Sequence, residues 1–305
     1  MGGCQGMTEL LMVDSTPSVF GLRFITTYVL RIGDKLVVVD PGPVVTVECL
    51  VRKILELHPR SVEVVLTHVH IDHAGNTGHL VHSLRARGVE VRVWVHPRGA
   101  RHIRDPSRLW EASLAVLGET ARIYGELLPV PREAVHETRD GEELVLDGAR
   151  LVFVHSPGHA SHHQSILAVV GGSRVLFTGD SAGIYVPETG GLVPTTPPPF
   201  HPDKYMESLE KMVALKSSRL AFTHTGVGPA SLLEAHREQI MLWLALAEEA
   251  VAEDTELREF LEKVLARDQL ARRAYSYLSK SSYTLQAMLH TAQGVMEAVR
   301  EKGVR

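Results

Sequence analysis

Hydrophobic and polar positions along the chain follow two alternating patterns. Short apolar runs bounded by Gly, Pro or Asp are typical of strands, whereas apolar residues at three- and four-residue spacing are typical of helices. Strands are predicted at residues 25–30, 35–39, 62–66, 90–95, 143–154 (two strands broken at Asp147-Gly148), 165–170, 174–177 and 220–222. Helices are predicted at residues 44–57, 76–87, 107–124 and 203–215. This mixture predicts an α/β (α+β) domain with two strand-rich halves.

The pattern changes from residue 231 onward. Strand-type runs disappear, and apolar residues recur at helical spacing at Ile240, Leu244, Ala247 and Val251. We therefore predict a mixed domain over residues 1–252 and a helical C-terminal extension over residues 253–305. The segment 187–202 holds six of the 16 prolines and is expected to form a stiff loop.

Length and charge disfavour several classes of protein. With 305 residues the chain can bury a large core without a metal or disulfide, so a metal bound here would serve function rather than folding. The 32 basic and 36 acidic side chains give a net charge of −4, which disfavours nucleic acid as a partner. The longest uncharged apolar run, residues 240–247, is too short to span a membrane. We expect a small molecule, rather than nucleic acid or a membrane, as the partner.

Two further features of the composition bear on where the protein works. The first basic residue is Arg23, so the N-terminal stretch lacks the basic segment of a secretory signal, and we expect a cytoplasmic protein. The chain has a single Asn and six Gln, and its Arg residues far outnumber its Lys residues. Scarce thermolabile amides are typical of a protein from a thermophile.

The polar residues with the most chemical potential directly follow predicted strands. In chain order they are Asp40, the segment Thr67–His73, Pro157-Gly158-His159, Gly179-Asp180 and Thr223-His224. Loops at strand ends are where α/β folds place their sites, so we expect these segments to meet.

The segment from His68 to His73 holds three His and one Asp within six residues. Imidazole and carboxylate groups are the ligands of zinc and of related transition metals. Neighbouring residues on an extended segment point to opposite sides, so one stretch can serve two metals. A carboxylate elsewhere in the chain, such as Asp180, could bridge them.

The stretch Thr67–Gly75, with its His-x-His-x-Asp-His pattern, resembles the signature of the metallo-β-lactamase superfamily. The later motifs at His159, Asp180 and His224 follow in that family's order, and Asp40 after an apolar strand also matches. The resemblance covers roughly residues 22–250. It implies a four-layer αββα sandwich, here with a C-terminal helical appendage, whose site lies at one edge.

The resemblance also implies a role for each motif residue. His68, His70 and His159 would bind a first metal, and Asp72, His73 and His224 a second. Asp180 would bridge the two ions, and Asp40 would orient ligands from behind. The implied cofactors are two divalent ions, with zinc expected and iron or manganese as alternatives. A bridging metal-bound hydroxide would attack the substrate, with Asp72 and Asp180 as the catalytic carboxylates and Asp72 helping to move a proton.

The ligand set narrows the branch of the family. Branches with a Cys ligand are disfavoured because Cys4 and Cys49 lie away from the motifs, and flavodiiron reductases have Glu where this chain has His70. The remaining branch resembles glyoxalase II thioesterases and lactonases, which implies hydrolysis of an activated acyl bond, thioester or lactone. Two alternatives stay open: a mononuclear non-haem iron persulfide dioxygenase using His68, His70 and His159, and a metal-free binding module.

Substrate contacts are expected from residues 181–202 and from the helical tail. Tyr185 could donate a hydrogen bond to a substrate oxygen, although packing is the default role of such a tyrosine. The tail segment Tyr275–Tyr283 mixes aromatic side chains with Lys280. By analogy with glyoxalase II it could lean over the site, but a helical cap or a dimer surface is the favoured role for such a segment. A homodimer is therefore left open.

Overall fold

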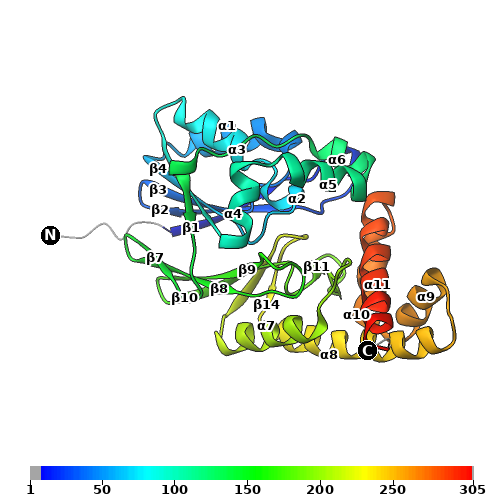
Figure 1. Ribbon diagram of the computed structural model, residues 1–305. Helices are drawn as coiled ribbons and strands as arrows, with labels where there is room; N and C mark the ends of the chain where they lie inside the picture. The colour runs from blue at the N-terminus through cyan, green and yellow to red at the C-terminus, as the bar shows by residue number, and fades with distance from the viewer. Residues whose placement is uncertain (1–7, 304–305) are drawn as a thin grey trace.

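The computed structural model describes residues 8–303 and contains two six-stranded mixed sheets that face each other (Figure 1). The first sheet has its strands in chain order: β1 (Thr8–Asp14), β2 (Thr26–Ile32), β3 (Lys35–Val39), β4 (Ser61–Val65), β5 (Glu90–Val95) and β6 (Val135–Glu137). Strands β3 to β6 run parallel. Because central parallel strands are covered on both faces, β3 and β4 are nearly continuous apolar runs.

The second sheet has the order β14-β13-β10-β9-β8-β7. Its strands are β7 (Glu143–Leu146), β8 (Ala149–His155), β9 (Gln164–Val170), β10 (Ser173–Gly179), β13 (Arg219–Phe222) and β14 (Val227–Pro229). Only β10 and β13 among these pair in parallel, so both deliver their carboxyl ends to the same edge. That edge carries the Gly179-Asp180 and Thr223-His224 motifs.

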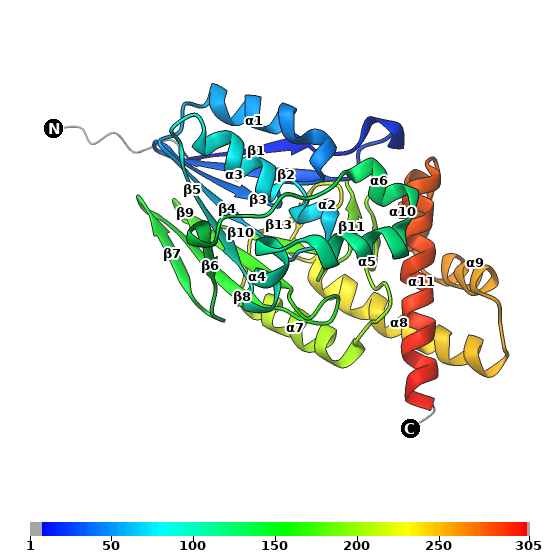
Figure 2. The same ribbon diagram turned by 45° about the horizontal axis from the view of Figure 1, so that its top comes forward.

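Helices cover the outer face of each sheet, so the predicted four-layer αββα sandwich is confirmed (Figures 1 and 2). Those of the first half are α1 (Val47–Glu56), α2 (Ile71–Ala74), α3 (Thr77–Arg85), α4 (Pro97–Arg104), α5 (Ser107–Leu117) and α6 (Glu119–Tyr124). The second sheet is covered by α7 (Pro202–Ala214) and α8 (Leu232–Ala252). The C-terminal helices are α9 (Leu257–Arg267), α10 (Gln269–Leu278) and α11 (Ser282–Gly303).

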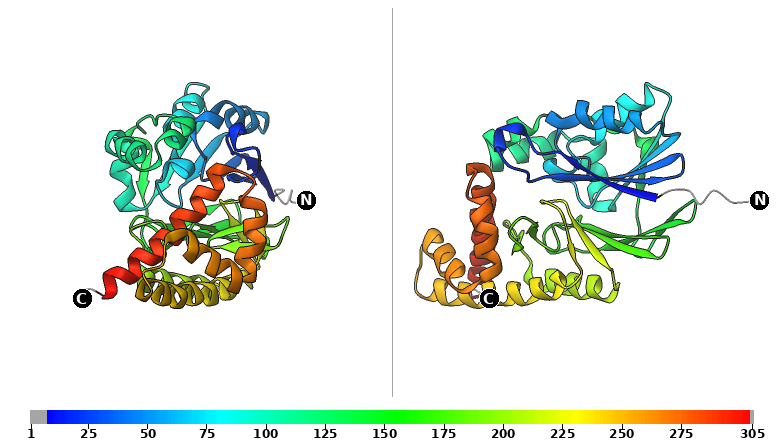
Figure 3. Two further views of the ribbon diagram at one scale, coloured as in Figure 1. Left: turned by 90° about the vertical axis from the view of Figure 1, so that its right-hand side faces the viewer. Right: turned by 180° about the vertical axis from the view of Figure 1, so that it is seen from behind.

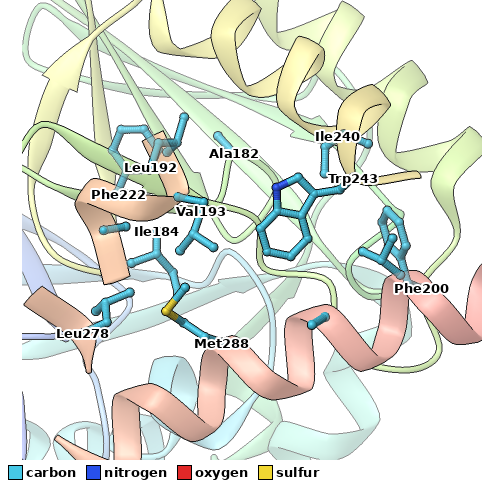
Figure 4. Close-up of a cluster of buried hydrophobic side chains, with 14 of the residues drawn as sticks. Ala182, Ile184, Leu192, Val193, Phe200, Phe222, Ile240, Trp243, Leu278 and Met288 are labelled. Carbon is cyan, nitrogen blue, oxygen red and sulfur yellow. The ribbon is translucent and has the colours of Figure 1, made fainter. Parts of the chain in front are cut away.

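Three hydrophobic clusters hold the layers together. One lies between the two sheets and includes Tyr28, Phe153 and Phe177. The second packs the first sheet against its helices through residues such as Leu50 and Leu80. The third and largest lies beneath the second sheet and joins it to all the C-terminal helices; Figure 4 shows its centre, where the Trp243 indole lies between α8 and α11. Burying these apolar surfaces is the main source of stability for the fold.

The C-terminal helices stand at the site end of the sandwich rather than on a sheet face (Figure 3). Helix α8 ends at Ala252, where the domain boundary was predicted. Buried side chains of α9, α10 and α11, among them Phe260, Ala274 and Met288, belong to the same hydrophobic cluster as Trp243. The helical extension therefore shares a core with the second sheet and its helices.

Two local predictions need correction. The helix predicted over residues 107–124 is two helices, because Gly118 has a positive φ of 55° that interrupts the helical path. The proline-rich segment is not simply a loop: β12 (Gly191–Val193) pairs antiparallel with β11 (Ile184–Val186) as a hairpin. A Cβ at Gly191 would lie 2.1 Å from the backbone nitrogen of Ala274, so glycine there lets the hairpin contact α10.

Candidate metal centre

The predicted ligand segments meet at one edge of the sandwich, where the carboxyl ends of β3, β4, β10 and β13 come together. His68 and His70 lie in the extended segment after β4, and Asp72 and His73 in the short helix α2. Asp180 directly follows β10, and Gly179 before it has a φ of 51°. A Cβ at Gly179 would lie 2.5 Å from His163 Nε2, so only glycine fits this approach.

Three imidazoles form the first group of converging donors. His70 Nδ1 lies 2.9 Å from His68 Nε2 and 3.2 Å from His159 Nε2. His159 also places Nδ1 2.8 Å from the carbonyl oxygen of Thr195, to which it donates. That hydrogen bond fixes the tautomer and leaves the Nε2 lone pair of His159 directed at the other two rings. These three residues are the ones predicted for a first metal, and their donor atoms lie within 4.8 Å of one another.

Asp72, His73 and His224 form a second group of converging donors. His224 Nε2 lies 3.5 Å from Asp72 Oδ2, and His73 Nε2 lies 3.9 Å from the same oxygen. The ring of Phe24 stacks on His224 with centroids 4.4 Å apart, which restricts its rotation. These are the residues predicted for a second metal.

Asp180 lies between the two groups and presents one carboxylate oxygen to each. Its Oδ2 is 3.4 Å from His159 Nε2, while its Oδ1 is 3.3 Å from His73 Nε2 and 3.5 Å from His224 Nε2. His163, which belongs to neither group, holds Asp180 from behind by accepting its backbone N–H at 3.0 Å. The geometry is the one that a bridging carboxylate needs.

Asp40 lies behind the cluster and is completely buried. Its Oδ2 accepts hydrogen bonds from His73 Nδ1 and from the hydroxyls of Thr67 and Thr223 at 2.7–2.8 Å, and its Oδ1 accepts the Thr67 backbone N–H at 2.8 Å. Because Thr67 donates to Asp40, it accepts from His68 Nδ1 at 3.1 Å. One carboxylate thus fixes the tautomers of two imidazoles, so that both Nε2 lone pairs face the cluster.

The two groups differ in their electrostatics. Burial, together with His159, lowers the pKa of His70 to about 4, and burial lowers the pKa values of His68 and His159 as well, so these three rings are neutral at pH 7. Burial would also lower the pKa of His73, but the carboxylates of Asp180, Asp72 and Asp40 outweigh it and raise that pKa well above its usual value. The acidic half of the cluster therefore favours a positive charge, which a metal ion can supply in place of a proton.

Two donor atoms of the cluster lack a hydrogen-bond partner in the part of the chain that the structure describes, which fits a metal site. Within residues 8–303, His73 Nε2 and Asp180 Oδ1 are buried and neither accept nor donate a hydrogen bond. Buried polar atoms are normally satisfied, so an unpaired imidazole nitrogen and an unpaired carboxylate oxygen that face each other are suited to a shared cation. Neutral imidazoles and carboxylates suit zinc, iron and manganese alike, so the donor set does not fix the element.

A cavity of about 360 Å³ opens onto the cluster. Its floor contains His70, Asp72, His159, Asp180 and His224. Its walls come from α5 and α6 on one side and from α11 and the turn Pro197-Pro198 on the other. Of the predicted tail segment Tyr275–Tyr283, Tyr283 lines the cavity, and residues further along α11 line it as well.

Sequence reasoning missed most of the residues in these walls. Helix α5 and the α11 residues Gln286, Ala287 and His290 belong to ordinary amphipathic segments that carry no chemical motif. Tyr185 is not among the cavity-lining residues; its ring packs near Phe222, with centroids 5.5 Å apart. Its contact with substrate stays a prediction.

Two further observations concern the cysteines and the helices outside the cluster. Cys49, on α1, lies away from the cluster, and Cys4 falls outside the described residues. Among the described helices, none has the length and apolar character needed to cross a bilayer.

Comparison with known proteins gives a family match over most of the chain. Residues 20–224 match the model of the metallo-beta-lactamase superfamily. A metallo-beta-lactamase fold-containing protein of Sulfurisphaera tokodaii is 35% identical over 182 residues, which make up 58% of this chain and 66% of that relative. A hydroxyacylglutathione hydrolase of Aeromonas hydrophila is 25% identical over 196 residues, or 64% of this chain and 58% of the hydrolase.

Solved structures share the fold over nearly the whole chain. An archaeal metallo-beta-lactamase superfamily protein from Sulfolobus tokodaii superimposes with a TM-score of 0.68 at 25% identity, covering 97% of this chain and 100% of the other. A metallo-beta-lactamase family protein from Thermus thermophilus gives a TM-score of 0.59 at 22% identity, covering 96% and 94%. Both similarities include the C-terminal helices, since they extend well beyond residue 252.

Proposed function

The chain belongs to the metallo-β-lactamase superfamily, and on that premise we propose that it is a metal-dependent hydrolase. The reaction proposed is cleavage of an activated acyl bond, a thioester or a lactone, in a small molecule. The distant similarity to a hydroxyacylglutathione hydrolase supports this branch of the family. The 360 Å³ cavity is of the size that small-molecule sites have, which supports a small substrate.

The observation that carries the proposal is the position of Asp180. Its two carboxylate oxygens face different groups of donors, each group complete with three residues. This favours a dinuclear site: His68, His70 and His159 would hold one ion, Asp72, His73 and His224 the other, and Asp180 both. Zinc is the proposed metal, because a borderline ion suits mixed imidazole and carboxylate ligands.

The chemistry of such a site divides between the ions and the chain. When bound, the ions would make a water molecule acidic near neutral pH and polarise the acyl carbonyl. The protein chain orients the metal-binding imidazoles and excludes water from the cavity. Asp40, Thr67 and Thr195 fix the orientation of the imidazoles, and the walls of the cavity hold the substrate over the floor.

Asp72 is the proposed residue for proton transfer. Its side chain is partly exposed and lines the cavity, unlike the fully enclosed His68 and His73. Burial opposes ionisation of Asp72, but His73 and His224 outweigh it and hold its pKa below the usual range, so the carboxylate is charged at neutral pH. A carboxylate with a low pKa is a weak base, so Asp72 would accept a hydrogen bond from water or substrate at the cavity floor and assist the transfer of the proton rather than keep it.

The test is turnover of a thioester and lactone panel by the metal-loaded protein, before and after chelation. We expect hydrolysis that chelation abolishes and zinc restores, together with near-complete loss of turnover in His70→Ala. The matched control His201→Ala replaces an exposed histidine outside the cluster and should behave as wild type.

Other outcomes would replace this proposal. One iron per chain with oxygen uptake on a persulfide would indicate the mononuclear dioxygenase. A His70→Ala variant with unchanged function, stability and metal content would indicate a metal-free binding module.

A further inference from the structure

The walls of the cavity are mainly apolar, and within the described residues they carry no Lys or Arg; the polar residues among them include Ser113, Thr120, His162, Gln286, His290 and Thr291. Within residues 8–303, no Lys or Arg lines the cavity, and the acidic Asp72 and Asp180 lie at its floor. Above them the walls present apolar side chains, namely Phe24, Leu109, Val116, Leu117 and Ile184. An anionic substrate would find a counter-charge only at the metal-binding floor. An uncharged group with an apolar chain would match the walls along their length.

Helix α5 gives a second, independent observation. None of its 11 residues is fully buried, although it carries apolar residues over most of its length. Val116 is 70% exposed and lines the cavity at the same time. Exposed apolar side chains at the mouth of a cavity are covered when an apolar ligand binds, and that burial is the main driving force for binding.

We propose that the substrate is an uncharged acyl ester, thioester or lactone whose acyl part is an apolar chain lying between α5 and α11. This inference rests on the proposed hydrolase function and adds the substrate class to it. The neutral polar residues Gln286 and Thr291 on α11 leave hydrogen-bonding groups beside the chain. A glutathione thioester fits poorly, because its peptide carries two carboxylates and the described cavity lining offers no cationic side chain to pair with them.

The proposal predicts how activity depends on chain length. Burial of one methylene contributes about 0.8 kcal/mol, equivalent to about a fourfold gain in kcat/KM. With S-acyl-N-acetylcysteamine thioesters, which are uncharged, we expect kcat/KM to rise about tenfold or more from butanoyl to hexanoyl. S-hexanoylglutathione should be a poorer substrate than the uncharged hexanoyl thioester.

Two wall variants and one control isolate the apolar contact. Val116→Asp and Ala112→Asp each place a carboxylate on the exposed face of α5, one helical turn apart, where unfolding is not expected. Each should lower kcat/KM for the hexanoyl thioester about tenfold more than for the acetyl thioester. Val145→Asp is the matched control, because Val145 on β7 is 68% exposed and lies outside the cavity.

A binding measurement separates this inference from the proposed function. Primary alkyl amides from acetamide to octanamide are neutral and serve as unreactive probes, and calorimetry should show their Kd falling with chain length in wild type but less in Val116→Asp. If amides bind in this way but no ester or thioester turns over, the hydrolase proposal fails, and the part of the inference that stands is that the cavity binds an uncharged apolar chain. If thioesters turn over with no dependence on chain length, or the glutathione thioester is preferred, the inference is overturned and the hydrolase proposal stands. If amides do not bind, the inference is likewise overturned.

Discussion

The floor and the walls of the cavity are built in different ways. The floor comes from strand ends, where polar motifs in the sequence become a cluster whose atoms face one another at 2.9–3.9 Å. The walls come largely from helices that carry no chemical motif in the sequence. Their residues line the cavity only because of how the helices pack. A buried aspartate, Asp40, organises the floor, and a second buried aspartate, Asp268, joins helices α8 and α10 in the C-terminal helical core.

These two aspartates show what the difference means. Asp40 aims imidazoles at a shared point, so its hydrogen bonds serve chemistry. Asp268 accepts from Gln239 Nε2 at 2.7 Å, from Trp243 Nε1 at 2.8 Å and from the backbone N–H of Ala271 at 3.0 Å, so its hydrogen bonds join α8 to α10. Loss of Asp40 should therefore lower activity, and loss of Asp268 should lower the free energy of unfolding.

The largest effect is expected at Asp180, where the two groups of candidate metal ligands meet. Asp180→Ala removes the carboxylate that both groups share, so we expect turnover to fall by about a thousandfold or more, as when one member of a catalytic unit is lost. Metal content should fall in parallel, measured by elemental analysis. Asp147→Ala, at an exposed turn far from the cluster, is the control. Full turnover in Asp180→Ala would contradict the proposal that Asp180 bridges two metal ions.

The next effect concerns the packing of α8 against α10. Asp268→Ala leaves the buried donors of Gln239 and Trp243 without an acceptor and removes the N-cap of α10, so the free energy of unfolding should fall by about 3 kcal/mol. The exposed Asp105→Ala, which loses only local hydrogen bonds to Ser107, should lower the free energy of unfolding far less. Chemical denaturation measures both. A folded Asp268→Ala protein that had lost its metal would contradict the separation between the candidate metal cluster and the helical core.

A smaller effect on activity is expected behind the floor. Asp40→Asn keeps the side-chain shape and tolerates the positive φ of 48°, but it replaces an acceptor of several hydrogen bonds with a group that also donates. Metal affinity or kcat should fall about 10–100-fold, as for other changes behind a metal ligand. Asp147→Asn, also at positive φ but exposed, is the matched control and should change neither quantity. An Asp40→Asn protein with wild-type metal affinity would show that Asp40 does not orient the ligands.

The last prediction uses His236, a buried histidine of α8. Burial lowers the pKa of His236 to about 4, although its hydrogen bond to Gln239 opposes that shift. The unfolded chain binds this proton near pH 6.5, so His236 contributes stability that is complete above that pH and is lost as the pH falls toward about 4. Between pH 7 and pH 5 the loss is about 2 kcal/mol for this one group.

His236→Gln removes the titrating group and should flatten the pH dependence of the unfolding free energy by that amount. The exposed His201→Gln should leave the dependence as it is in wild type. Equal slopes in all three proteins, measured by denaturation at pH 5, 6 and 7, would contradict the assignment.

The contrast between the strand-end floor and the helical walls of the cavity also explains which parts of the structure could be predicted from the sequence. The positions of β2–β5, β7–β10 and β13 and the convergence of the ligand segments follow from local pattern, because apolar runs form strands and their ends meet at one sheet edge. The strands β1, β6 and β14 were not predicted. The wall formed by α5 and α11 depends on how distant helices pack, which no local pattern encodes. The break at Gly118 and the β11–β12 hairpin were missed for a related reason: one glycine and the contact of Gly191 with α10 outweigh the local preferences for a long helix and a proline-rich loop.

Metal content per chain is the most direct test of the central claim, that the His and Asp cluster is a dinuclear metal centre. The protein would be purified without added metal and analysed for all divalent transition ions alongside its concentration. The account predicts about two ions per chain in wild type and a clear loss in Asp180→Ala. Stoichiometric binding of a single ion that is unchanged in Asp180→Ala, or an active protein without metal, would contradict it.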